Sequence, residues 1–266
     1  MNPGPVRDDD GGPRRYVRLM PATPAWPPKS APRLFVAGPL APASPVVIDG
    51  SQAHYLSRVM RVREGDTVIL CDDITGEWAA RVTAVGKRDI VVVPTEKLRE
   101  REQVPDFWLC AALLKKDRFD LVLEKATELG ARRIQPVLTR RCVADKLNPD
   151  RARSIMTEAA EQCARTALPM LAEPVKLEAL LQAWPAERDL FFADEQGGAS
   201  AAAEFATRRG PAALLIGPEG GFDDAERETV RALPQARPIS LGPRILRGET
   251  AAISATALWM GIAGDW

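Results

Sequence analysis

Histidine and cysteine are scarce in this chain, and their scarcity limits the chemistry open to it. The sequence contains a single histidine, His54, and four cysteines that lie far apart without a CxxC pair. This pattern argues against a structural zinc site, so we expect no bound metal; dispersed cysteines are also typical of a reducing compartment, which predicts a cytoplasmic location. A catalytic imidazole is not expected, because His54 lies in the N-terminal part of the chain, away from the motifs described below.

The chain also lacks net charge and long apolar runs. Lysine and arginine together number 36, as do aspartate and glutamate, so the formal net charge is zero. No overall positive field draws the protein to nucleic acid or anionic lipid, and any RNA binding must come from local basic patches. No apolar run approaches the roughly 18 residues of a membrane span, so we expect no membrane partner.

The first 32 residues are rich in proline and glycine and carry no periodic apolar pattern. They also lack the uninterrupted hydrophobic stretch of a secretory signal. We expect a disordered tail over residues 1–32. The alternative is an arm that touches RNA through Arg14, Arg15 and Arg18.

Short β segments separated by turn signals follow the tail. Strands are expected at 33–36, 66–72, 77–85 and 89–96. Their alternating or β-branched composition and the intervening turn signals are typical of a small β module, interrupted by one short helix at 53–61. The pattern predicts a β-barrel-like domain over residues 33–103.

Apolar strands then alternate with helices. The expected strands are 107–114, 133–139, 189–194, 212–217 and 238–242. Such β/α alternation predicts a parallel sheet covered on both faces, over residues 104–266. In sheets of this kind, ligands bind at the carboxyl ends of the strands.

Three of these strands end in loops that contain glycine. The loops are ADEQGG (193–198), GPEGG (217–221) and LGPR (241–244). Glycine lets the backbone approach a ligand closely, although a single such turn is more often only a tight connection. Asp223 and Glu226 form a capping pair that already occupies the next helix start, and the GxxxxGK[ST] and GxGxxG fingerprints are absent. These loops therefore suit a neutral or cationic ligand better than a phosphate.

Several stretches of the chain resemble a known family. The strings are LLIGPEGGFDDAE (214–226), ISLGPRILRGETAA (239–252), EKATELGA (124–131), EQCAR (161–165) and HYLSRVMRVREGD (54–66). They resemble bacterial RsmE-type enzymes of the SPOUT superfamily, which methylate N3 of a uridine in 16S ribosomal RNA. The resemblance runs in order from Arg33 to the C-terminus. One departure is Gly248, where the family usually has threonine, and any role of that hydroxyl is in doubt here.

The resemblance implies an α/β fold: a SPOUT-type trefoil knot preceded by a PUA-like β-barrel. It further implies a homodimer that binds S-adenosylmethionine in its knotted loops and acts on 16S ribosomal RNA or the small ribosomal subunit. Two alternatives stay open. One is a knotted methyltransferase acting on another RNA, such as a ribose 2′-hydroxyl of transfer RNA; the other is a non-catalytic RNA-binding assembly factor.

Site residues follow from the matching motifs. Cofactor-binding candidates are Glu195, Gly217, Pro218, Glu219, Gly220, Gly221, Leu241, Gly242 and Leu246. Uracil N3–H is weakly acidic, so methylation there needs a base or a nearby cation. Arg247 is expected to stabilise the developing anion or hold a phosphate, and Glu249 to accept the proton or orient Arg247. The alternative for this pair is an ion pair without a catalytic role.

Local basic clusters are the expected grip on RNA. The candidates are Arg58, Arg61, Arg63, Lys115, Lys116, Arg118, Arg141 and Arg165, with Arg132, Arg133 and Arg140 as possible extensions. Each could instead be an ordinary solvated charge, and Arg165 could pair with Glu161 one helical turn away.

Overall fold

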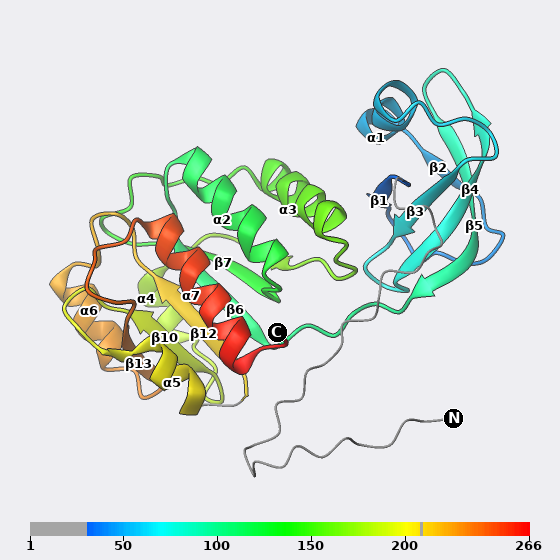
Figure 1. Cartoon of the computed structure of the whole chain (residues 1–266). Helices are drawn as coiled ribbons and strands as arrows, with labels where there is room; N and C mark the ends of the chain where they lie inside the picture. The colour runs from blue at the N-terminus through cyan, green and yellow to red at the C-terminus, as the bar shows by residue number, and fades with distance from the viewer. Residues whose placement is uncertain (1–30, 208–209) are drawn as a thin grey trace, which may run out of the picture.

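The computed structural model describes residues 31–207 and 210–266, which form two β-sheets and their helices (Figure 1). The first sheet is built from residues 33–99 and the second from residues 107–240. The tail expected over residues 1–32 lies, except for its last two residues, outside the described part of the chain.

The first sheet has five strands in the order β1-β3-β4-β5-β2. Their bounds are β1 Arg33–Phe35, β2 Val46–Ile48, β3 Thr67–Cys71, β4 Glu77–Val85 and β5 Ile90–Arg99. Register shifts interrupt the β4–β5 ladder, and such bulges bend a sheet toward a barrel. The expected helix begins earlier than predicted: α1 (Gly50–His54) continues into a π-helical turn, η1 (Tyr55–Val59).

The second sheet has the strand order β11-β13-β10-β12-β6-β7-β8, with β9 also beside β7, and every pairing is parallel. The bounds are β6 Phe107–Ala112, β7 Arg133–Leu138, β8 Met170–Leu171, β9 Val175–Lys176, β10 Asp189–Ala193, β11 Ala199–Ser200, β12 Ala212–Ile216 and β13 Ala236–Ser240. The predicted parallel α/β sheet is therefore confirmed.

Helices cover both faces of the second sheet. Their bounds are α2 Lys116–Glu128, α3 Pro149–Cys163, α4 Leu177–Gln182, α5 Ala201–Thr207, α6 Asp224–Arg231 and α7 Gly248–Ala263. Buried residues of α2, α3, α5 and α7 share one hydrophobic cluster, and those of α4 and α6 share another. The second sheet is thus a middle layer with helices on either side.

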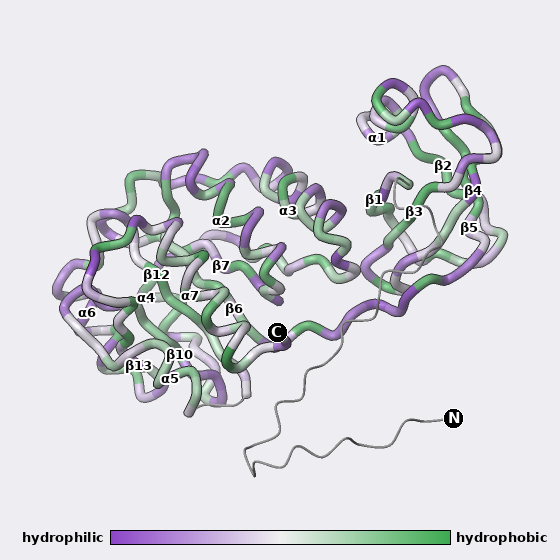
Figure 2. Tube along the Cα trace, in the orientation of Figure 1, coloured by the Kyte–Doolittle hydropathy of each residue, from purple (hydrophilic) through white to green (hydrophobic). Residues whose placement is uncertain are grey.

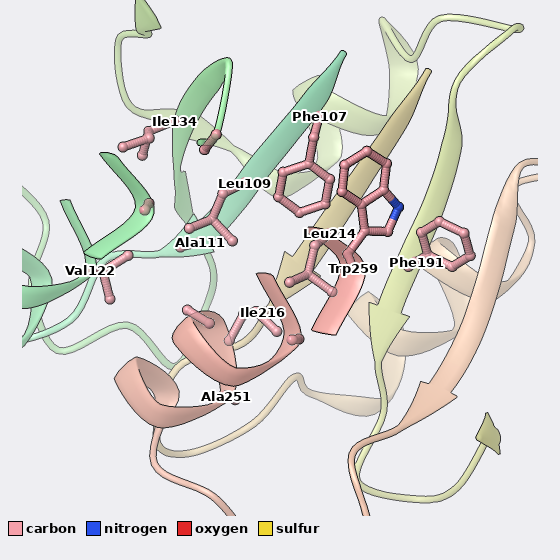
Figure 3. Close-up of a cluster of buried hydrophobic side chains, with 14 of the residues drawn as sticks. Phe107, Leu109, Ala111, Val122, Ile134, Phe191, Leu214, Ile216, Ala251 and Trp259 are labelled. Carbon is pink, nitrogen blue, oxygen red and sulfur yellow. The ribbon is translucent and has the colours of Figure 1, made fainter. Parts of the chain in front are cut away.

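Strand residues alternate between these two clusters because successive side chains point to opposite faces. In β12, Leu214 packs on the α7 side and Leu215 on the α6 side, and both are fully buried. Figure 2 shows the resulting hydrophobic run along the central strands. Phe107 of β6 stacks on Trp259 of α7 with ring centroids 4.4 Å apart (Figure 3), which fixes α7 against the sheet.

The end of α3 joins the two sheets. Phe35 N donates to Glu161 Oε1 at 2.8 Å, and Arg99 Nη2 donates to the carbonyl of Ala164 at 2.7 Å. Burial raises the pKa of Glu161. The EQCAR segment is therefore part of the contact between the barrel and the parallel sheet.

Candidate functional site

Three loops meet at the carboxyl edge of the parallel sheet. Strands β13, β10 and β12 are parallel neighbours, so their carboxyl ends lie side by side. We call the segments that follow them the β10 loop (194–198), the β12 loop (217–223) and the β13 loop (241–247). The glycine-bearing turns therefore lie together at one edge of the sheet.

The β12 loop lies between Glu195 of the β10 loop and the start of α7. A Cβ added at Gly221 would lie 2.2 Å from Glu195 Oε1, so the Glu195 side chain of the β10 loop lies directly on this glycine. Gly221 also has a φ of 66°, which side chains rarely adopt. On the other side, the carbonyl oxygen of Gly217 is 3.4 Å from the Cβ position of Gly248, at the start of α7.

Other glycines of the loops border open space. Within the described residues, no atom lies within 4 Å of a Cβ built at Gly197 or Gly242, and both have positive φ. Leu241 and Leu246 pack against the core below the β13 loop. The backbone of the β10 and β13 loops is therefore open to close approach by a ligand.

Carboxylates gather around these loops. Arg118 Nη1 contacts Glu219 Oε1 at 2.6 Å, and Arg118 Nε lies 3.8 Å from Glu249 Oε1. The other oxygen, Glu249 Oε2, is buried and has no hydrogen-bond partner among the described residues. A buried carboxylate oxygen without a donor is costly, which makes it an acceptor for a ligand N–H or O–H.

Arg247 lies apart from this ion-pair cluster. It is the exposed N-cap residue of α7, and within residues 31–207 and 210–266 it forms no ion pair. An ion pair between Arg247 and Glu249, which the sequence left open, is not formed; Glu249 faces Arg118 instead. The Arg247 guanidinium thus keeps its donors available.

Gly248, where threonine is usual in the RsmE-type family, lets α7 begin close to the sheet. An added Cβ would lie 3.0 Å and 3.2 Å from the two terminal carbons of Leu114. A side chain there would push α7 away from Leu114 or displace Leu114 itself. The glycine therefore sets how closely α7 approaches the ends of β6 and β12.

The predicted RNA-contact residues are spread over two regions. Lys115 and Lys116 are exposed at the start of α2, and Arg141 donates from Nη1 to the carbonyl of Gly220 at 2.8 Å. These residues and Arg118 border the three loops. In the barrel, Arg61 and Arg63 are exposed, and Arg58 lines an open groove of about 670 Å³ that also includes Lys87 and Arg88.

Arg165 differs from the other candidates. It is 4% exposed, and it donates to the carbonyls of Thr127 and Ala131 at 2.6 Å and 2.7 Å. A guanidinium enclosed in this way is not available to a phosphate. The structure gives Arg165 a stabilising role at the end of α3 in place of the RNA contact predicted for it, and not the pairing with Glu161.

The first turn of α6 contains one set of polar contacts that the sequence predicted and one that it did not. The predicted capping box is present: Asp223 Oδ1 accepts from Glu226 N at 2.7 Å, and Glu226 Oε2 accepts from Asp223 N at 3.1 Å. That backbone hydrogen bond from Glu226, aided by Arg140, lowers the pKa of Asp223. Sequence reasoning missed Arg227, the next residue, which donates hydrogen bonds to the β10 and β12 loops. Its position beside the capping pair is the one signal in the sequence that could have identified it.

The described residues hold no group of three or more potential metal ligands, and no helix among them is long and apolar enough to cross a membrane. Residues 100–260 match the family described as RNA methyltransferase domain, and residues 48–95 match the RNA methyltransferase PUA domain.

Curated and solved proteins resemble most of the chain. A ribosomal RNA small subunit methyltransferase E of Synechocystis sp. is 33% identical over 234 residues, which cover 85% of this chain and 76% of that protein. A methyltransferase structure from Legionella pneumophila with bound cofactor SAM has a TM-score of 0.81 at 28% identity and covers 89% of this chain and 99% of its own. A ribosomal RNA small subunit methyltransferase E of Neisseria gonorrhoeae, bound to S-adenosyl methionine, has a TM-score of 0.81 at 26% identity, with the same coverage of 89% and 99%.

Proposed function

The chain belongs to the family of ribosomal RNA small subunit methyltransferases E, and from this premise we propose that it methylates N3 of a uridine in 16S ribosomal RNA, using S-adenosylmethionine. The observation that carries the proposal is the convergence of the β10, β12 and β13 loops at one sheet edge. Two structural relatives hold this cofactor. The alternative of a non-catalytic RNA-binding factor gives no reason for the open glycine backbone at these loops or for the Glu249 oxygen that no described residue partners.

The residues at the loops fit the cofactor. When bound, S-adenosylmethionine supplies a methyl group carried on a positively charged sulfur. The carboxylates of Glu195 and Glu219, held in place by Arg227 and Arg118, offer acceptors for the hydrogen-bond donors of the cofactor. The open backbone at Gly197 and Gly242 leaves room for close contact, and Gly217, Pro218, Gly220, Gly221, Leu241 and Leu246 form the rest of the proposed binding surface.

We assign catalytic roles to Arg247 and Glu249. The N3 proton of uracil must leave for the new N–C bond to form, and Glu249 Oε2 has no hydrogen-bond partner among the described residues and is assigned to accept it. Loss of the proton leaves negative charge on the uracil ring, which the free guanidinium of Arg247 stabilises through charge-assisted hydrogen bonds until methyl transfer neutralises it. Arg118, which contacts Glu219 and lies near Glu249, holds the two carboxylates in position.

Residues 33–103 are proposed to bind RNA and residues 104–266 to carry out the transfer. Arg58, Arg61 and Arg63 of the barrel and Lys115, Lys116, Arg118 and Arg141 of the second sheet would contact the RNA backbone. A trefoil-knotted chain path, a homodimer and a cytoplasmic location complete the proposal. Light scattering of the purified protein tests the dimer: a mass of twice 29.0 kDa is expected.

A reconstituted reaction tests the function. Purified protein is incubated with isotopically labelled S-adenosylmethionine and with either free 16S ribosomal RNA, small ribosomal subunits or transfer RNA, and the digested nucleosides are identified by mass spectrometry. N3-methyluridine from 16S ribosomal RNA is expected. A ribose-methylated nucleoside from transfer RNA would favour the other knotted methyltransferase, and a lack of cofactor binding in calorimetry would leave an RNA-binding factor.

A further inference from the structure

Arg227 donates hydrogen bonds to two of the three loops. It lies in the first turn of α6, and its side chain is 6% exposed. Nη2 donates to Glu195 Oε1 at 2.7 Å in the β10 loop and to the carbonyl of Phe222 at 3.2 Å in the β12 loop. One planar guanidinium therefore spans segments that are about 30 residues apart in sequence.

The remaining donors of Arg227 strengthen the same link. Nε donates to Asp194 Oδ1 at 3.2 Å, and the Asp194 side chain is 0% exposed. Asp194 Oδ1 also accepts from Gln196 N at 3.0 Å, which fixes the turn of the β10 loop. Nη1 reaches Asp224 Oδ1 at 3.1 Å within α6 itself.

This geometry depends on the shape of arginine. The guanidinium offers donors in a rigid fork, whereas a lysine ammonium is a point charge that cannot reach several acceptors in one plane. Strands β10 and β12 pair directly, so the sheet sets where the two loops begin. Beyond the strand ends, the β10 loop and the β12 loop contain no helix or strand, and side-chain contacts such as those of Arg227 hold them together.

Arg231 provides a natural comparison. It lies one turn later on α6 and donates from Nε to Asp194 Oδ2 at 3.0 Å, but its side chain is 42% exposed and it contacts neither Glu195 nor the β12 loop. Both arginines neutralise Asp194. Among the described residues, only Arg227 of the two links the β10 loop to the β12 loop.

We propose that Arg227 is a positioning residue: it holds Glu195 and the β12 loop at the spacing required to bind S-adenosylmethionine. This inference rests on the proposed function, since it concerns the cofactor loops of that same site. Because its side chain is 6% exposed and its donors are engaged within the protein, we assign Arg227 no direct contact with cofactor or RNA. Its loss is therefore expected to weaken cofactor binding specifically, leaving the recognition of RNA intact.

The test compares Arg227→Gln, Arg227→Lys and Arg231→Gln with the unaltered protein. Kd for S-adenosylmethionine is measured by calorimetry, KM for cofactor and for RNA by initial rates, and Tm by thermal unfolding. Arg227→Gln is expected to raise the cofactor Kd and KM on the order of tenfold or more, as for loss of a charge-assisted hydrogen bond, with the RNA KM unchanged. Arg231→Gln should stay within about twofold, because Arg231 is 42% exposed, contacts neither Glu195 nor the β12 loop, and leaves Arg227 to neutralise Asp194.

Arg227→Lys keeps the buried charge, so it tests the role of Arg227 in cofactor binding even if Arg227→Gln fails to fold. A cofactor Kd that remains raised in Arg227→Lys, at a Tm close to that of the unaltered protein, supports a role for the fork geometry. Unaltered cofactor affinity in a folded Arg227 variant overturns the inference, as does an equal rise in both KM values. If the unaltered protein itself binds no S-adenosylmethionine, the proposed function fails, and the inference fails with it.

Discussion

The two edges of the parallel sheet both carry arginines, but these arginines are used differently. At the amino edge, the ring of Trp108 lies between the guanidinium groups of Arg133 and Arg188, at 4.3 Å and 3.8 Å. Arg188 also donates to the carbonyls of Asp106 and Ala212 at 3.0 Å. The guanidinium groups of this edge are thus engaged with the fold.

At the carboxyl edge, positive charge is left available. Arg247 forms no ion pair with any described residue, and Lys115 and Lys116 are exposed beside the loops. Even the paired Arg118 bridges a carboxylate that is only partly satisfied. Residue type alone does not distinguish the two sets. The end of the strand separates part of the two sets: the exposed Arg247 and the lysines lie at the carboxyl end, where parallel α/β sheets bind ligands, although the engaged Arg227 lies there as well.

The largest effect is expected from Arg247→Ala. Loss of a donor to the developing charge should lower kcat on the order of 100-fold or more. The cofactor Kd should change by no more than a few-fold, because Arg247 is assigned to the uracil and not to the cofactor. Single-turnover methylation and calorimetry measure the two quantities. Turnover equal to that of the unaltered enzyme would show that Arg247 has no catalytic role, and would contradict the proposed difference in use between the arginines of the two edges.

The opposite edge should respond in stability and not in rate. Arg188→Gln removes the donor to two backbone carbonyls and the partner of Asp106, and we expect a loss of about 2 kcal/mol in the free energy of unfolding. The kcat of the folded variant should be unchanged. Urea unfolding gives the first value and initial rates the second; a rate loss without a stability loss would contradict a purely structural amino edge.

Substitutions at two glycines with positive φ separate the effect of backbone strain from the effect of a changed contact between the loops. Gly221→Ala and Gly65→Ala each place a side chain at positive φ, which costs about 1–2 kcal/mol of stability. Only at Gly221 does the new Cβ meet the Glu195 carboxylate, whereas at Gly65 nothing described lies within 4 Å. We therefore expect weaker cofactor binding in Gly221→Ala alone, measured by calorimetry. Equal affinities would show that the contact between the β10 and β12 loops is not needed.

The smallest effect is expected outside both edges, at the contact between barrel and sheet. Burial raises the pKa of Glu161, so its contribution to stability is full below the unfolded pKa and is lost as pH rises through the folded pKa. Glu161→Gln keeps an acceptor for Phe35 N without the charge. Its stability should exceed that of the unaltered protein increasingly as pH rises toward neutral, in urea unfolding at several pH values, with kcat unchanged. A pH-independent difference would rule out titration of Glu161 as the cause.

Periodicity predicted much of the fold. The apolar stripe of α2, with Phe119, Val122 and Leu123, is buried as expected, and the long strands of the parallel sheet begin within about two residues of their predicted positions. The two-residue strands β8, β9 and β11 were not predicted, because so short a segment carries no period. The knot stays a prediction, since a chain path through a loop leaves no local pattern.

For the site, the parallel β/α pattern predicted that the glycine-bearing loops share one end of the sheet, but it could not identify the contacts between them. Arg227 lies in the acid-rich run DDAERE, which resembles any solvated helix face, and its partner Glu195 is distant in sequence. The RNA contact predicted for Arg165 was wrong for the opposite reason. The sequence does not show whether an arginine will contact a phosphate or, as here, two backbone carbonyls.

The pairing of β6 with β12 has a consequence for how the chain is made. In the first sheet, every pairing is completed within residues 33–99, so this sheet can form early in synthesis. Strand β6 instead pairs with β12, which is about 100 residues further along. Contacts of such wide sequence separation slow folding. The edge of the apolar strand β6 that pairs with β12 therefore stays uncovered during synthesis until β12, in the last quarter of the chain, has left the ribosome.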